Sequence, residues 1–170
     1  MPDPLPNQTD IELHMPYIAK LARDCNRIVE IGVGHGNGST RAIASVQPAI
    51  HIMVDHFVAQ PIEIPDGAIF VKGDSRSMKT VFYVSRCMAF AAPDLIFIDT
   101  HHTYEQLEQE LRVWSIIAWS GTKWLFHDTY MNGEPNPMCA AIVEYCADHK
   151  NMQYREISRE SHGLWIMESR

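Results

Sequence analysis

The stretch that decides the fold is Arg27-Ile28-Val29-Glu30-Ile31-Gly32-Val33-Gly34-His35-Gly36-Asn37-Gly38-Ser39-Thr40. Apolar residues surround one acid, glycines follow at every second position, and a Ser-Thr pair typical of a helix start comes last. Glycine suits such a turn because it tolerates positive φ and lets a ligand approach the backbone. The stretch therefore predicts a buried strand, a tight turn and a helix N-terminus, which together can cradle a nucleotide-type cofactor.

The spacing of the glycines narrows the class of cofactor. A dinucleotide-binding fingerprint requires the pattern G-x-G-x-x-G. When the pattern is counted from Gly32, its last position holds Asn37 instead of glycine, and when it is counted from Gly34 that position holds Ser39. The fingerprint is therefore absent. A P-loop is excluded as well, because no lysine follows the last glycine. The spacing that fits is acid-x-G-x-G-x-G, starting at Glu30, and the alternative is a glycine-rich turn that binds no ligand.

Composition places the chain among globular proteins. It has 170 residues, 46% of them hydrophobic, which is enough for a sizeable core and suits one domain. We expect a single domain over 1–170, with 1–8 as a flexible N-terminal tail. The formal net charge is -7, from 14 basic and 21 acidic residues, and no basic run is visible. Such a chain is a poor candidate for binding the phosphate backbone of a nucleic acid, so nucleic acid is not its default partner.

The N-terminal residues lack the basic start and the apolar core of a signal peptide. No apolar run is long enough to span a bilayer. None of the four cysteines forms a C-x-x-C pair, which indicates reduced and mostly buried thiols. We therefore expect a cytoplasmic protein with no membrane partner.

Strand and helix patterns alternate along the chain. Strands are predicted at 27–31, 51–54, 68–71, 95–98, 123–126, 153–157 and 164–167. Helices are predicted at 9–24, opened by a capping box at Thr9, and at 39–46, 75–91, 103–119 and 138–149. This order implies an α/β fold with a mostly parallel seven-stranded sheet and helices on both faces. The last two strands are joined by a short turn and must pair as an antiparallel hairpin.

Acids gather at the predicted strand ends, where open α/β sheets bind their ligands. They are Glu30, Asp55, Asp74, Asp99 and Asp128. The carboxylate of Asp55 is placed to accept both hydroxyl protons of a ribose, and a helix cap or a solvated loop acid is the alternative. For Asp74 the alternative is the N-cap of the following helix, a role that Ser75 can also take.

The motif that starts at Glu30 resembles the first motif of Rossmann-like class I S-adenosylmethionine (SAM) methyltransferases. Two later segments, Phe97-Ile98-Asp99-Thr100-His101-His102-Thr103-Tyr104-Glu105 and Trp124-Leu125-Phe126-His127-Asp128-Thr129, sharpen the resemblance. They are similar to a subgroup of small-molecule O-methyltransferases with an Asp-x-x-His-x-Tyr-Glu pattern and a later His-Asp-Thr.

The resemblance implies a set of residues for each role. Those implied to bind the cofactor are Glu30, Gly32, Gly34, Gly36, Asn37, Ser39, Thr40, Asp55, His56, Asp74, Ser75 and Asp99. Asp74 would meet the adenine, and a divalent metal such as Mg²⁺ would be held by Asp99, Asp128 and His127, the last standing where some relatives have an acid. His102 would be the general base beside Asp99, since neutral imidazole accepts protons near pH 7.

Other readings of these residues stay open. His102 can be an ordinary loop histidine, His101 is its neighbour and competitor, and Asp128 can bond backbone amides of its own loop. We expect His14 on a helix face and residues 130–135 in a substrate-side loop. The tryptophans are expected in the core: Trp114, Trp119, Trp124 and Trp165.

The predicted function is SAM-dependent methyl transfer to a hydroxyl of a small molecule, with a divalent metal assisting. One alternative is a non-catalytic or regulatory subunit that binds SAM or a nucleoside. The glycine spacing argues against another, an NAD(P)-dependent oxidoreductase. Because the chain has almost no insertion to shape a substrate pocket, a partner subunit in a homo-oligomer could complete it.

Overall fold

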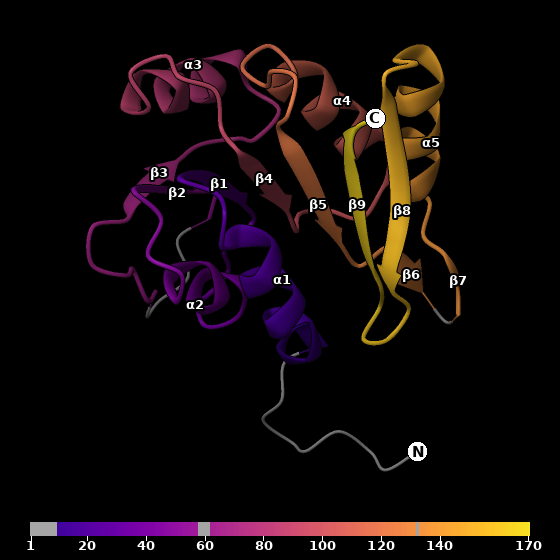
Figure 1. The fold of residues 1–170 in the computed structure, drawn as a ribbon, viewed down its shortest axis with the longest axis horizontal. Helices are drawn as coiled ribbons and strands as arrows, with labels where there is room; N and C mark the ends of the chain where they lie inside the picture. The colour runs from indigo at the N-terminus through magenta and orange to yellow at the C-terminus, as the bar shows by residue number, and fades with distance from the viewer. Residues whose placement is uncertain (1–9, 58–61, 132) are drawn as a thin grey trace.

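Seven strands form one sheet in the order β3-β2-β1-β4-β5-β9-β8 (Figure 1). The computed structural model describes residues 10–57, 62–131 and 133–170. The strands are β1 (Arg27–Ile31), β2 (Ile50–Asp55), β3 (Ile69–Lys72), β4 (Leu95–Ile98), β5 (Lys123–His127), β8 (Met152–Ser158) and β9 (Leu164–Ser169). Neighbours among β1 to β5 pair parallel, whereas β9 pairs antiparallel with both β5 and β8. The predicted mostly parallel sheet with a C-terminal antiparallel hairpin is confirmed.

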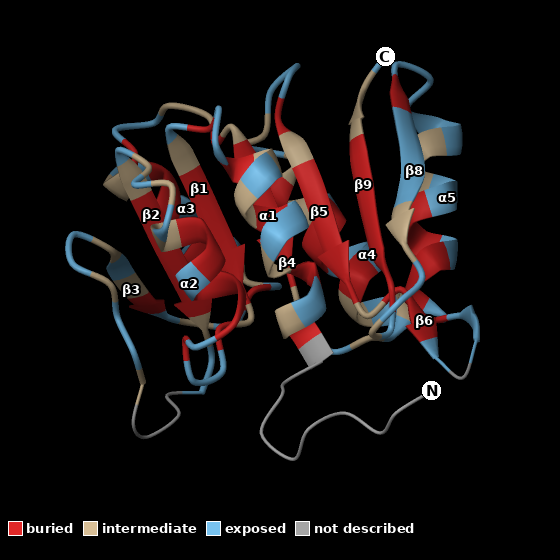
Figure 2. Cartoon of the chain, turned by 60° about the horizontal axis from the view of Figure 1, so that its bottom comes forward, coloured by how far each residue is buried: buried red, intermediate tan, exposed pale blue. Residues whose placement is uncertain are grey.

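Helices cover both faces of this sheet, again as predicted. They are η1 (Asp10–His14, a 3₁₀ helix), α1 (Met15–Ala22), α2 (Ser39–Ala44), α3 (Met78–Cys87), α4 (Tyr104–Trp114) and α5 (Met138–Asp148). Figure 2 shows α1 and α2 lying over one face of the buried strands. The other three helices, α3, α4 and α5, share a core with the opposite face.

The core forms two layers because successive strand residues point to opposite faces. Ile28 packs in the layer that contains Ile18 of α1 and Ile43 of α2. Its neighbour Val29 packs in the layer that contains Val84 of α3 and Leu111 of α4. A strand covered on both faces reads as a continuous apolar run, which is why the central strands were visible in the sequence.

Helix ends differ most from the sequence-based expectation. The predicted first helix is split into the 3₁₀ helix η1 and the shorter α1. Its proposed cap, Thr9, and the expected tail 1–8 lie outside the described residues. The helix expected at 75–91 is only Met78–Cys87, with Ser77 as the N-cap. The alternative role of Asp74 or Ser75 as its N-cap is therefore excluded. Thr103 does cap α4, accepting the backbone N–H of Gln106 at 3.2 Å.

The helix expected at 103–119 ends at Trp114. Trp119 consequently lies in the loop after the helix with 69% of its surface exposed, so its expected place in the core was wrong, while the other three tryptophans are buried. Two short strands, β6 (Tyr130–Met131) and β7 (Glu134–Pro135), form a hairpin within the loop after β5. Asn132, at the tip of this expected substrate-side loop, lies outside the described residues.

No helix in the described part of the chain is both long enough and apolar enough to cross a bilayer. All four cysteines are free thiols, and Cys25 and Cys139 are buried.

Candidate functional site

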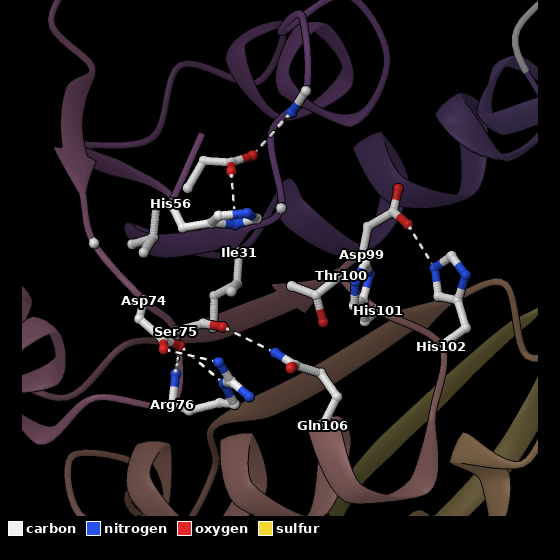
Figure 3. A pocket seen from close by; sticks show the side chains of 15 residues that line it. Ile31, His56, Asp74, Ser75, Arg76, Asp99, Thr100, His101, His102 and Gln106 are labelled. Carbon is white, nitrogen blue, oxygen red and sulfur yellow. Dashed lines mark hydrogen bonds and ion pairs between the residues drawn. The ribbon is translucent and has the colours of Figure 1, made fainter. Parts of the chain in front are cut away.

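A hollow of about 490 Å³ opens at the carboxyl ends of β1, β2 and β4 (Figure 3). Nine of the residues singled out from the sequence line it: Gly32, Gly34, Asp55, His56, Asp74, Ser75, Asp99, His101 and His102. Residues that sequence reasoning did not assign to it also line it, among them Arg76, Thr100 and Gln106. A pocket of this size and position suits a cofactor of nucleoside dimensions.

The glycine turn after β1 requires glycine for two different reasons. Gly32 has φ of +83°, and a Cβ built there would collide with the backbone carbonyl of Asp99. Gly34 has φ of +56°, and its missing Cβ would meet nothing within 4 Å. Gly32 thus lets the turn pack against the end of β4, whereas Gly34 leaves open space beside the hollow.

Glu30 lies beneath the turn and is fully buried. Its Oε1 accepts hydrogen bonds from Ser39 Oγ at 2.6 Å and Thr40 Oγ1 at 2.9 Å, and its Oε2 lies 2.9 Å from His51 Nε2. This carboxylate therefore joins β1 to the start of α2 and to β2. His51 was missed in the sequence, where a single polar residue inside an apolar strand was its only signal.

Five residues expected to bind the cofactor do not line the hollow: Glu30, Gly36, Asn37, Ser39 and Thr40. The hydroxyls of Ser39 and Thr40 are turned toward Glu30. A direct contact between any of the five and a cofactor remains a prediction.

Asp55 holds the glycine turn from the end of β2. Its Oδ2 accepts the backbone N–H groups of Val33 at 2.9 Å and Gly34 at 3.2 Å, and its Oδ1 accepts that of Phe57 at 2.9 Å. His56 Nδ1 also lies 3.5 Å from Oδ1. Acceptance of the ribose hydroxyls by this carboxylate remains a prediction.

Asp74 lies at the opposite side of the hollow and is paired with Arg76. The guanidinium donates from Nε to Oδ1 at 3.0 Å and from its second terminal nitrogen to Oδ2 at 2.9 Å. Hydrogen bonds from the Arg76 side chain and backbone hold the pKa of this exposed carboxyl below its usual value. Asp74 faces the hollow as predicted from the strand-end pattern, but it does so as part of an ion pair.

Two acids and two imidazoles meet where β4 and β5 end. Asp99 Oδ1 lies 3.4 Å from His102 Nε2 and 3.5 Å from His127 Nδ1. Asp128 approaches the same two atoms, His102 Nε2 at 3.2 Å and His127 Nδ1 at 3.0 Å. Each imidazole therefore contacts both acids.

Asp128 also has a φ of +55°. Residues other than glycine adopt this backbone conformation rarely, and it is more frequent at functional sites.

The electrostatics of this cluster are strongly coupled. Burial opposes ionisation of Asp99, but its contacts with His102 and His127 outweigh burial and lower its pKa to about 2. Burial likewise opposes protonation of His127, yet Asp128 and Asp99 together raise its pKa to about 10. Burial also acts against the charged form of His102, and again the bonds to Asp99 and Asp128 prevail and raise its pKa.

Ligand atoms of Asp99, His102 and Asp128 lie within 4.8 Å of one another, which is a spacing that could hold a metal ion. His127, expected from the resemblance as a ligand, is not in this group, and His102, expected as the base, is. Two carboxylates and one imidazole suit a divalent cation. The two carboxylates fit the Mg²⁺ that the resemblance implies, and His127 Nδ1 contacts both of them.

His14 was expected at the surface or on a helix face; it ends the 3₁₀ helix η1 and is fully buried, so a surface position was wrong. Its ring meets the ring of His127 edge-on, with 5.0 Å between the centroids. The 3₁₀ helix η1 thereby packs against His127, the buried imidazole of the cluster.

Comparison with known proteins matches the chain by structure alone: no protein-family model matches the sequence, and no curated protein matches it. A putative caffeoyl-CoA O-methyltransferase from Staphylococcus aureus superposes with a TM-score of 0.66 at 13% identity, over 98% of this chain and 86% of that one. The chain has the fold of small-molecule O-methyltransferases. A TDP-rhamnose 3′-O-methyltransferase of calicheamicin biosynthesis superposes with a TM-score of 0.64 at 15% identity, over 92% and 77%.

The MycE methyltransferase of mycinamycin biosynthesis, solved with Mg and SAH, superposes with a TM-score of 0.63 at 13% identity. The match covers 91% of this chain and 48% of that one, so this chain spans about half the length of MycE. A further MycE structure also contains mycinamycin VI, a small-molecule ligand.

Proposed function

We propose that this protein is a SAM-dependent methyltransferase that acts on a hydroxyl of a small molecule, with a divalent cation held by the carboxylates of Asp99 and Asp128 and with His102 as the general base. One observation carries the proposal: the glycine turn, the acids that follow or end β2 and β3, and Asp99 and His102 all line a single hollow, and Asp128 contacts His102. Solved structures with the same fold add support, since they include O-methyltransferases and one bound to Mg and SAH.

The residues of the hollow fit SAM chemically. Gly34 leaves room beside the turn, and Asp55 and Asp74 both line the hollow, where their carboxylates can accept hydrogen bonds from the ribose and the adenine. The ion pair between Asp74 and Arg76 can open to admit an adenine amino group, because both side chains are partly exposed.

The reaction needs two things from the protein. The acceptor oxygen must attack the methyl carbon opposite sulfur, so that the O–C bond forms as the C–S bond breaks and the electron pair stays on sulfur. The hydroxyl proton must also leave, and His102 Nε2 is the basic atom at the edge of the hollow that can take it. A divalent cation on the two carboxylates would acidify a bound hydroxyl and relieve the charge that holds a proton on His102.

The first test is calorimetric titration with SAM and S-adenosylhomocysteine (SAH), with NAD⁺ as the comparison ligand, in the presence and absence of Mg²⁺. Binding of SAM and SAH but not NAD⁺ is expected. No binding of either SAM-type ligand under any condition would refute the proposal. Turnover by the parent and loss of turnover in His102→Ala, with SAH binding kept, would separate an enzyme from a binding or regulatory subunit. A cytoplasmic location, a homo-oligomer and the single domain over 1–170 remain predictions.

A further inference from the structure

Glu110, in the middle of α4, is a buried acid that the proposed chemistry does not use. Its side chain is fully buried, and no ion pair joins it to a basic side chain within the described residues. Burial raises the pKa of its carboxyl, although hydrogen bonds from its neighbours act in the opposite direction. Burying a carboxylate without a cation is costly, so its place calls for a compensating role.

Three donors from separate segments converge on this carboxylate. Ser75, after β3, donates from Oγ at 2.5 Å, and Thr100, after β4, donates from Oγ1 at 2.9 Å. Gln106, one turn earlier on α4, donates from Nε2 at 2.6 Å. Short bonds to one buried carboxylate are stronger than bonds between neutral groups, so Glu110 holds the ends of two strands at a set distance.

All three donors line the hollow, whereas Glu110 lies behind them. Figure 3 shows Gln106 directed toward Ser75, which it also meets at 3.3 Å. The backbone carbonyl of Ser75 accepts a further hydrogen bond, from Trp114 Nε1 at 2.8 Å, so this wall is held by α4 at two points. Thr100 follows Asp99, against whose carbonyl the glycine turn packs.

We propose that Glu110 is a positioning residue of the cofactor pocket, which sets the spacing between the Ser75 wall and the Thr100 wall. The inference rests on the proposed function, because it concerns the affinity of that same pocket for SAM. Glu110 touches neither cofactor nor acceptor. Its loss should therefore weaken binding through the three residues that do face the hollow, and should affect KM for SAM more than kcat.

The test compares Glu110→Gln with the parent and with Glu108→Gln. A glutamine has nearly the same shape, but its amide nitrogen would face a donor, so one of the three bonds is lost. The affinity for SAH, measured by calorimetry, should fall about tenfold, the equivalent of one hydrogen bond to a charged group. Glu108 is an exposed acid on the same helix and belongs to none of these bonds. Its variant should bind SAH like the parent.

A purely structural brace would give a different result. In that case Glu110→Gln would lower the melting temperature and leave the SAH affinity of the folded protein unchanged, which would overturn the inference. If Glu110→Gln does not fold, Glu110→Asp and Thr100→Val take its place. The aspartate keeps the charge but retracts it, and the valine removes one donor. Each should bind SAH more weakly than the parent, and parent-like affinity in both would refute the inference.

A double variant separates the indirect effect from the direct one. If Glu110 acts through Ser75, then combining Ser75→Ala with Glu110→Gln should cost less affinity than the two single losses added together. Full additivity would contradict the proposed coupling. Absence of SAH binding by the parent would instead refute the proposed function and the inference with it. Parent binding with unchanged variants refutes the inference alone.

Discussion

His102 Nε2 lies 3.2 Å from Asp128 Oδ2, although one residue precedes α4 and the other follows β5. The contact exists because β4 and β5 are parallel neighbours, so their carboxyl ends meet at one edge of the sheet. It makes His102 a partner of both acids of the cluster, with Asp99 as the other.

Removal of Asp128 should abolish metal binding. Asp128→Asn replaces one of two carboxylates by a neutral amide, which weakens the attraction for a divalent cation. We expect binding of Mn²⁺ and Mg²⁺, measured by calorimetry on metal-free protein, to fall below detection. Asp148→Asn, a change at an exposed acid at the end of α5, is the control and should leave metal binding intact. Metal binding that survives Asp128→Asn would place the ion elsewhere.

The cluster should also make stability depend on pH. The pKa of His127 is raised from 6.5 to about 10, so its contribution is complete below pH 6.5 and disappears as pH rises through about 10. The pKa of Asp99 is lowered from 3.8 to about 2, so its contribution is complete above pH 3.8 and disappears as pH falls through about 2. Urea unfolding of the chelator-treated protein should therefore show both contributions in full between pH 3.8 and 6.5.

His127→Gln isolates the alkaline part of this dependence. Without the imidazole, the loss of stability between pH 6.5 and 10 should become smaller than in the parent. His101→Gln is the control, because His101 is exposed and outside the acid–imidazole contacts of the cluster. An unchanged alkaline slope in His127→Gln would show that the cluster does not hold a charged imidazole.

Glu30 should matter for folding more than its distance from the hollow suggests. Removing the carboxylate leaves its buried hydrogen-bond partners unsatisfied, which typically costs about 1 to 3 kcal/mol for each group. We expect a loss of this order in the free energy of unfolding for Glu30→Ala, measured by urea denaturation. The exposed ion pair between Glu63 and Arg41 offers the comparison, and Glu63→Gln should change stability by less than about 1 kcal/mol. Equal losses in the two variants would contradict a bracing role for Glu30.

The sheet could be predicted from the sequence because each central strand is an apolar run with a clear turn after it. The predicted bounds of β1 and β4 match the structure at every residue. Helix starts were harder, since Asp74, Ser75 and Ser77 are all good N-caps and local sequence does not choose among them. The apolar residues after Trp114 favoured a longer helix, but they form a turn and loop in which Ile116 and Trp119 are exposed while Ile117 packs against the core.

The site could be predicted in part, for a reason that lies in the topology. Acids at parallel strand ends must share one edge of the sheet, so Asp55, Asp74 and Asp99 were found as facing the hollow. Glu110 and His51 were not found, because Glu110 is one of several acids on a polar helix and His51 is a single polar residue in an apolar strand, while partners of each come from other segments. Only the folded chain brings those partners together.

Gly32 and Gly34 should respond differently to the same substitution. Gly32→Ala places a Cβ against the carbonyl of Asp99, so the glycine turn must move away from β4. SAH binding should be lost, and the melting temperature should fall. Gly34→Ala meets no atom within 4 Å, so it carries only the cost of positive φ, about 1 kcal/mol, in the folded protein.

Because the Cβ of Gly34→Ala would point into open space beside the hollow, that variant should fold well but bind SAH more weakly by crowding the ligand. Melting curves with and without SAH distinguish the two effects, since a ligand raises the melting temperature only of a protein that binds it. Gly34→Ala should melt near the parent and gain little from SAH. A full SAH-dependent shift in that variant would mean that no ligand atom approaches Gly34, and would move the proposed cofactor site away from the turn.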